Sequence, residues 1–293
     1  MSAVRLWFAA SRPRTLPIAV APVLVGTALA ISQDELHVGA FMAAIVGSLF
    51  IQIGTNLAND YSDARRGADA EDRLGPVRVI AGGLLPPRRV LVGTYVAFAI
   101  AIAAGSYLAA AAGPELLLVG AASIAAGVLY TGGPRPYGYA GLGEVFVFLF
   151  FGVVAVVGSY YVQTERIEWE ALALSVPVGL LASAILVVNN VRDLETDRRA
   201  GKRTLAVSLG RTRTRRLFTT MLVVSFLGPP AIALGGGLSW WLMLSLGALV
   251  LVPPLRKTVA TRSDGPALNG ALAAAGQLLA LFSALLAVGI LLS

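Results

Sequence analysis

The chain has 293 residues, of which 57% are hydrophobic and 13% are charged, and its mean hydropathy is +0.77. Soluble domains carry about 25% charged residues, so this composition excludes a soluble globule, and it is too apolar for a disordered chain. The absence of cysteine excludes disulfide scaffolds and thiolate chemistry, and a single histidine, His37, excludes a multi-histidine metal site. The sequence therefore predicts an all-α integral membrane protein.

Apolar segments recur along the whole chain. A helix that crosses a bilayer needs about 20 mostly apolar residues. Nine segments come near that length, so we expect a single domain, residues 1–293, of nine transmembrane helices. The predicted spans are Leu16–Ile31, Val38–Leu57, Val90–Ala112, Leu116–Tyr130, Leu142–Val162, Trp169–Val188, Leu217–Leu234, Leu238–Pro254 and Leu268–Leu292.

The basic residues predict the orientation of these spans. If all nine segments cross, 22 of the 23 Lys and Arg residues lie on one side of the membrane and only Arg166 lies on the other. Basic loops stay in the cytoplasm, so we expect the N-terminus inside and the C-terminus outside the cell membrane. The net charge of +7 is then explained by membrane orientation and contact with lipid, so we expect no nucleic-acid partner.

Two of the predicted cytoplasmic loops resemble each other. Each begins with asparagine at the end of an apolar segment, continues through carboxylates one helical turn apart, and reaches an Arg-Arg pair and a glycine. Four spans separate the copies, so both emerge on the same face, which favours an internal duplication. The copies read Asn56-Leu-Ala-Asn59-Asp60-Tyr-Ser-Asp63-Ala-Arg65-Arg66-Gly67 and Asn189-Asn190-Val-Arg192-Asp193-Leu-Glu195-Thr-Asp197-Arg198-Arg199-Ala-Gly201-Lys202-Arg203.

The spacing within each copy predicts convergent oxygen ligands. In the first copy, one helix face carries positions i, i+3, i+4 and i+7, which are Asn56, Asn59, Asp60 and Asp63. In the second copy, one face carries positions i and i+4, which are Asp193 and Asp197. Two such faces meeting would bring together carboxylate and amide oxygens, which suit Mg²⁺, beside arginines that suit a diphosphate. The alternative is a pair of solvated loops in which acids pair with arginines and basic residues contact anionic lipid.

At these motifs the chain resembles the UbiA superfamily of intramembrane aromatic prenyltransferases. The matching patterns are Asn-x-x-x-Asp at Asn59 to Asp63 and Asp-x-x-x-Asp at Asp193 to Asp197. The resemblance implies nine transmembrane helices with the motifs on helices two and six, and a polyprenyl diphosphate bound with Mg²⁺. A third acid expected about four residues after Asp63 is replaced by glycine, and the next acid is Asp69.

Further stretches resemble the naphthoate branch of this superfamily, among them Tyr130-Thr-Gly-Gly-Pro-Arg135 and Gly201-Lys-Arg-Thr-Leu-Ala206. That branch transfers a polyprenyl chain to 1,4-dihydroxy-2-naphthoate, with loss of CO₂ and diphosphate, and forms demethylmenaquinone. A family member that prenylates 4-hydroxybenzoate or homogentisate remains an alternative.

The resemblance also implies roles for individual residues. Asp63, Asp193 and Lys202 are expected to be catalytic, and Asn59, Asp60 and Asp197 join the two acids as metal ligands. Glu144, an acid in an apolar run, is expected either to orient the aromatic substrate or to pair with Arg135. The residues expected to bind diphosphate are Asn56, Arg65, Arg66, Tyr130, Arg135, Asn189, Asn190, Lys202 and Arg203.

Two other classes of membrane protein fit the composition. A cation transporter would hold its acids near mid-membrane at broken helices, whereas here the motif acids fall at predicted cytoplasmic helix ends. A CDP-alcohol phosphotransferase would carry Asp-Gly-x-x-Ala-Arg, and the sequence contains no such run. Both patterns favour the prenyltransferase.

Overall fold

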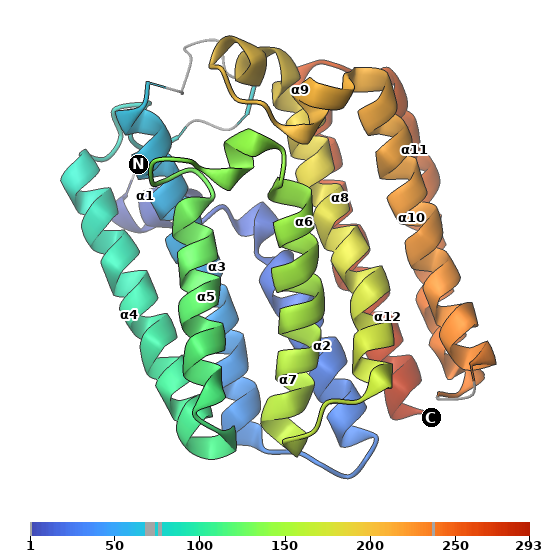
Figure 1. Ribbon diagram of the computed structural model, residues 1–293. Coiled ribbons are helices and arrows are strands. Elements are labelled where there is room, and N and C mark those ends of the chain that lie inside the picture. Colours follow the sequence, from blue (N-terminus) through green and yellow to red (C-terminus); the bar gives the residue numbers. More distant parts are fainter. Residues whose placement is uncertain (1, 68–73, 76–77, 236–237) are drawn as a thin grey trace.

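The computed structural model describes residues 2–67, 74–75, 78–235 and 238–293, and the regular elements within these ranges are all helical. The long helices stand side by side as a bundle (Figure 1). The elements are α1 (Ala3–Ala10), η1 (Pro13–Thr15), α2 (Pro17–Ile31), α3 (Val38–Arg65), α4 (Pro87–Ala112), α5 (Glu115–Leu129), η2 (Tyr137–Ala140), α6 (Gly143–Val147), η3 (Phe148–Val154), α7 (Ala155–Thr164), α8 (Trp169–Arg199), α9 (Leu205–Leu209), α10 (Arg211–Leu234), η4 (Trp240–Leu251), α11 (Val252–Thr261) and α12 (Gly265–Leu291).

The bundle confirms a multi-pass membrane protein. Within the described residues, eight helices are long and apolar enough to cross a membrane. The predicted fourth span corresponds to α5, which is apolar but has only 15 residues. It runs alongside α3 and α4, and the chain ends N and C lie at opposite ends of the bundle (Figure 1).

The two helices that carry the motifs are longer than a bilayer requires. With 28 residues in α3 and 31 in α8, their lengths are ~42 Å and ~46 Å at the rise of an α-helix, against ~30 Å of hydrocarbon. Both end in basic residues, which favour the negative end of the helix dipole. Gly67 and Gly201 follow with φ of 64° and 71°, a conformation that favours glycine and ends a helix. The motifs therefore lie in the last turns of helices that are longer than the hydrocarbon layer is thick.

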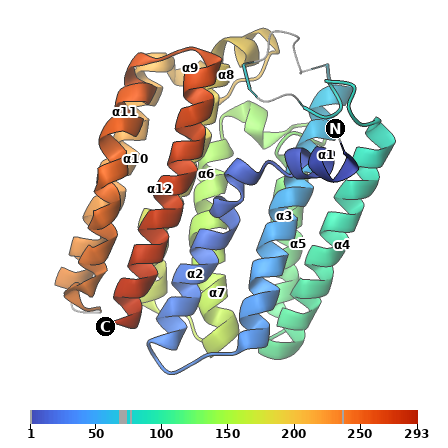
Figure 2. The same ribbon diagram turned by 180° about the vertical axis from the view of Figure 1, so that it is seen from behind.

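The core surrounds α8. This helix packs against α10, α12 and η3, while α2 packs against α12 and α7. Seen from behind, α2 stands between α12 and α3 (Figure 2). The aromatic side chains of Tyr160, Phe218 and Phe282 are fully buried in this core. This tightly packed half supports one side of the cavity described below.

The helix α6–η3–α7 contains a π-helical segment, η3, in its middle. In a continuous α-helix, a residue four positions further along lies about 40° past the first residue around the helix axis. Side chains spaced by four residues therefore drift around the helix by about 160° over four such steps. A π turn contains about one residue more than an α turn. The side chains that follow it are therefore rotated back around the helix axis by about 100°, which offsets most of this drift. One stripe consequently faces the cavity along the whole helix: Phe146, Val147, Phe150, Phe151, Val154, Ala155, Gly158, Ser159 and Val162.

Candidate active site

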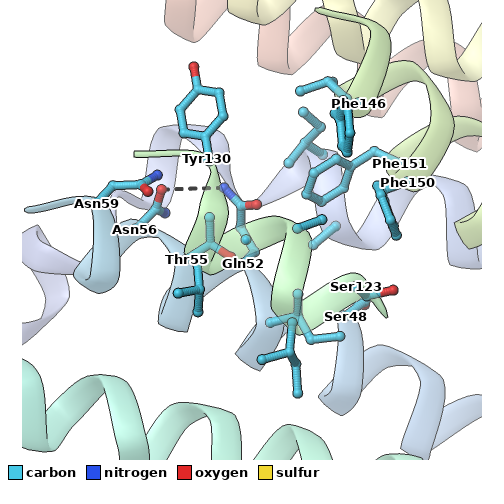
Figure 3. A pocket seen from close by; sticks show the side chains of 18 of the residues that line it. Ser48, Gln52, Thr55, Asn56, Asn59, Ser123, Tyr130, Phe146, Phe150 and Phe151 are labelled. Carbon is cyan, nitrogen blue, oxygen red and sulfur yellow. Dashed lines mark hydrogen bonds between the residues drawn. The ribbon is translucent and has the colours of Figure 1, made fainter. Parts of the chain in front are cut away.

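A cavity of about 940 Å³ lies between α2–α5 on one side and α6–α8 on the other. Its wall includes Asp63 near the end of α3 and Ala44 on the same helix, which places the two ~28 Å apart along the helix axis. Charged and amide side chains gather at the Asp63 end, and the rest of the wall is mainly apolar, with Ser48, Ser123 and Ser159 among its lining residues. In Figure 3, Gln52 and Asn56 of α3 lie across from Phe146, Phe150 and Phe151, and the Phe151 ring is the nearest of the three to Gln52 in this view. The shape and lining suit an amphiphile with a charged head and a long apolar tail.

Asp63 is the centre of the polar end. It is completely buried, and its Oδ1 accepts a hydrogen bond from the Tyr139 hydroxyl at 2.5 Å. Its Oδ2 lies 2.6 Å from Nη1 of Arg78 and 3.1 Å from Nζ of Lys202. Two cations and a hydroxyl thus stabilise the carboxylate, which offsets the cost of burying it.

The neighbouring motif residues on α3 make different contacts. Oδ1 of Asn59 accepts a hydrogen bond from the Thr131 hydroxyl at 2.8 Å, so this amide is oriented by the loop after α5. Asp60 accepts a hydrogen bond from the Val79 amide at 3.1 Å and does not line the cavity. Asn56 donates to the Ser11 carbonyl at 3.0 Å. Asn56 and Asp60 therefore tie α3 to the segments at residues 11 and 79.

On α8, Asp193 is held by its neighbour Arg192. Nε and Nη2 of Arg192 lie 2.7 Å and 2.6 Å from the two carboxylate oxygens of Asp193. The same guanidinium donates to Oδ1 of Asn189 at 2.7 Å and to Oδ1 of Asn269 at 2.8 Å. Asp193, Asn189 and Asp197 all line the cavity. The second motif is thus oriented by an arginine that belongs to the motif itself.

Lys202 reaches the first motif because the chain turns back after α8. Gly201 adopts a left-handed φ of 71°, and the Lys202 amide then donates to the Asp197 carbonyl at 2.9 Å. The Lys202 ammonium lies 4.7 Å from the centre of the Tyr139 ring, and its side chain is buried. The next residue, Arg203, is exposed and does not line the cavity.

The two tyrosines of the loop after α5 are electrostatically perturbed. Burial raises the pKa of Tyr139, and the Asp63 carboxylate beside its hydroxyl raises it further. Burial also raises the pKa of Tyr130, and the negative charge of Glu144 raises it further. Both phenols therefore remain neutral hydrogen-bonding groups.

The structure brings nine of the predicted site residues to the cavity wall and leaves six outside it. Arg65 lies over the ring of Tyr61, Arg66 donates to the Gly133 carbonyl, and Arg135 is exposed. The nine on the wall are Asn56, Asn59, Asp63, Tyr130, Asn189, Asn190, Asp193, Asp197 and Lys202, and the six others are Asp60, Arg65, Arg66, Arg135, Glu144 and Arg203. Asp69 lies outside the described residues.

Sequence reasoning assigned no role to four residues that orient the motif side chains. These are Arg78, Thr131, Tyr139 and Arg192. Arg192 sits inside the repeated motif, so its position beside Asp193 was a usable signal. The other three come from loops distant in sequence, and only their contacts reveal them.

The residues at the polar end fit a Mg²⁺ ion in their chemistry. Asp63, Asp193, Asp197 and Asn59 present hard oxygen donors to one cavity, and such oxygens are the preferred ligands of this ion. Within the described residues, no three acidic or histidine side chains lie close enough together to form a ready-made metal cluster. Asp63 forms ion pairs with Arg78 and Lys202, and Asp193 forms one with Arg192. Both carboxylates are therefore sites that bind positive charge.

The family model of the UbiA prenyltransferase family matches residues 19–269, a range that includes both motifs. The chain belongs to this family. It is 44% identical over 273 residues to a Mycobacterium tuberculosis protein named 1,4-dihydroxy-2-naphthoate octaprenyltransferase, covering 92% of this chain and 88% of that one.

Solved UbiA-family structures share this fold. A ligand-free UbiA homologue from Aeropyrum pernix K1 superimposes with a TM-score of 0.71 at 15% identity, over 94% of this chain and 97% of that one. A UbiA homologue from Archaeoglobus fulgidus, bound to GPP and Mg²⁺, gives a TM-score of 0.63 at 15% identity, over 96% and 99% of the two chains. The predicted all-α membrane bundle is therefore confirmed as a UbiA fold.

Proposed function

We propose that this chain transfers a polyprenyl group from its diphosphate to 1,4-dihydroxy-2-naphthoate, forming demethylmenaquinone in menaquinone biosynthesis. One structural observation carries the proposal: Asp63 and Asp193, from two distant motifs, line one cavity whose remaining wall is mainly apolar. The name of the 44%-identical relative supports the naphthoate as acceptor. Its name also gives an octaprenyl donor, which agrees with a long apolar cavity.

The polar end would hold the diphosphate. Arg78 and Lys202 are the cations nearest the cavity acid Asp63, and their N–H groups can donate to diphosphate oxygens. Bound Mg²⁺, held by Asp63, Asp193, Asp197 and Asn59, would act as a Lewis acid that neutralises the leaving group. The exposed cations Arg65, Arg66, Arg135 and Arg203 would contribute through the long-range field.

The remaining residues would direct the substitution. The allylic C–O bond of the donor breaks, and its electron pair leaves with the diphosphate, which the cations stabilise. The ring carbon that bears the carboxylate then forms the new C–C bond, and release of CO₂ returns electrons to the ring. The apolar stripe of α6–η3–α7 keeps water from the allylic cation, which water would otherwise convert to an alcohol.

We further propose that α5 completes nine spans, with the N-terminus and the active site on the cytoplasmic side. The positions of the chain ends at opposite ends of the bundle (Figure 1) support an odd number of passes. The eight long apolar helices among the described residues, together with α5, give that number. The distribution of basic residues supports the orientation, because 22 of 23 then lie at the end that carries the motifs.

A single experiment tests the activity and its cofactor. Membranes that contain the protein are incubated with labelled octaprenyl diphosphate and, separately, with dihydroxynaphthoate, 4-hydroxybenzoate or homogentisate, each with Mg²⁺ or with EDTA. We expect prenylated naphthoate in Mg²⁺ and none in EDTA. Prenylation of the benzoate alone would overturn the acceptor, and full turnover in EDTA would overturn the metal.

A further inference from the structure

Glu144 is a buried acid whose surroundings differ from those of the motif acids. Its side chain is only 4% exposed, and Oε1 accepts a hydrogen bond from Nδ2 of Asn190 at 2.8 Å. Its Oε2 is buried and makes no hydrogen bond within the described residues. An incompletely bonded buried carboxyl group is costly, so this pair is a feature that packing alone does not explain.

The pair determines which way the Asn190 amide points. An amide has a donating NH₂ end and an accepting carbonyl end. Because Nδ2 donates to Glu144, the carbonyl Oδ1 is directed away from that carboxyl group. Asn190 lines the cavity, and its Oδ1 accepts no hydrogen bond from the described residues. The cavity wall therefore presents an oriented hydrogen-bond acceptor at this point.

Tyr130 presents a second polar group beside this pair. Its hydroxyl lies next to the backbone of Gly143, which precedes Glu144, and it donates to no atom of the described residues. Tyr137, on the same wall, differs because its hydroxyl already donates to the Ala126 carbonyl at 2.9 Å. In Figure 3 the Tyr130 hydroxyl points away from Gln52. Tyr130 is thus the tyrosine of this wall whose hydroxyl remains available to a ligand.

This part of the wall also suits a planar ring. Phe146 stacks on Tyr137 with ring centres 3.9 Å apart and lies beside Phe150 in a similar orientation. The charged group next to Asn190 is a carboxyl group, which offers a diphosphate no positive charge. An aromatic molecule with a hydroxyl group matches both the rings and the two polar groups.

Given the proposed prenyltransferase activity, we propose that Asn190 and Tyr130 bind a ring hydroxyl of the aromatic acceptor, and that Glu144 is the positioning residue that orients Asn190. The hydroxyl donates to Oδ1 of Asn190 and accepts from the Tyr130 hydroxyl. This assignment replaces the sequence-based expectation that both residues bind diphosphate. It also resolves the alternatives for Glu144, whose bonded partner is Asn190 and not Arg135.

A substrate-analogue cycle tests the binding contact. Inhibition constants are measured for 1-hydroxy-2-naphthoate and 4-hydroxy-2-naphthoate, each of which lacks one acceptor hydroxyl, in the wild type, Tyr130→Phe and the matched control Tyr137→Phe. In the wild type and the control, loss of one of the hydroxyls should weaken binding about tenfold or more relative to dihydroxynaphthoate. In Tyr130→Phe that penalty should be smaller by about threefold or more, because only the bond to Asn190 then remains to be lost. Equal penalties in all three proteins would overturn the contact.

Two variants of Glu144 test its positioning role. Glu144→Gln keeps an oxygen that can accept from Asn190, so kcat/KM for the naphthoate should stay within about threefold of wild type. Glu144→Leu removes that oxygen, and KM for the naphthoate should rise about tenfold while KM for the prenyl diphosphate stays within about twofold. Equal losses in Gln and Leu, or a parallel rise in both KM values, would overturn the role.

The same experiments separate this inference from the proposed function. Absence of any naphthoate prenylation by the wild type, with prenyl diphosphate still bound, would refute the proposed acceptor and with it the contact. Normal wild-type turnover without any change in the analogue penalties would refute the contact alone.

Discussion

Lys202 is the cation whose removal most directly tests the assignment of the polar cavity end to a diphosphate. Its buried ammonium lies 3.1 Å from Oδ2 of Asp63. In Lys202→Ala, Asp63 keeps its ion pair with Arg78 at 2.6 Å and its hydrogen bond from Tyr139. The carboxylate is then not left unpaired, so we expect the variant to insert and fold.

The size of the effect follows from the kind of bond that is lost. A hydrogen bond to a charged group contributes about 1.5–3 kcal/mol, which corresponds to about a 10- to 150-fold change in rate. We expect that loss in kcat/KM for the prenyl diphosphate, because the ammonium would donate to the leaving group. The apparent affinity for the naphthoate should change by less than about twofold, since Lys202 does not contact the proposed acceptor wall.

The assay compares two single-lysine variants in vesicles. Lys257→Ala is the matched control, because Lys257 is the only other lysine and is exposed on α11. Initial rates are measured against donor and acceptor concentration in neutral and in anionic lipid. A donor effect well under tenfold for Lys202→Ala, or one that disappears in neutral lipid, would refute a diphosphate contact and indicate a lipid-facing lysine.

Three further outcomes are expected. Asp63→Asn and Asp193→Asn should each lose most turnover and weaken Mn²⁺ binding measured by electron paramagnetic resonance, and retention of both would contradict the metal assignment. Arg78→Ala should lower the melting temperature in detergent, because loss of its bond to buried Asp63 costs about 1–3 kcal/mol, and an unchanged melting temperature would show that the ion pair contributes no stability. Cysteines introduced into this cysteine-free chain as Ser263→Cys and Ser293→Cys should be labelled from the cytoplasm and from outside respectively, and labelling from one side would contradict an odd number of spans.

Most of the helix positions and the composition of the site could be predicted from the sequence. Bilayer thickness sets the length of an apolar run, so the predicted segments correspond to α2–α5, α6–η3–α7, α8, α10, η4–α11 and α12. Helical spacing placed Asn59 and Asp63 on one face, and both line the cavity. Lys202 was expected at the site because it follows the second motif directly, and it lines the cavity. These are local properties, which a short stretch of chain specifies by itself.

Tertiary structure alone decided which groups meet at each acid. Arg78 and Tyr139 contact Asp63 although they lie 15 and 76 residues after it in the chain. Arg65 also follows Asp63 but is exposed, and nothing in the local sequence pattern distinguishes it from Arg78. Asp60 shares a helix face with Asp63 by spacing, yet it bonds the Val79 amide and lies outside the cavity wall. A buried charge without a partner is costly because it has lost its contact with water. Its partners are the side chains that the packed bundle brings within about 3 Å of it. Only the assembled fold can therefore select them.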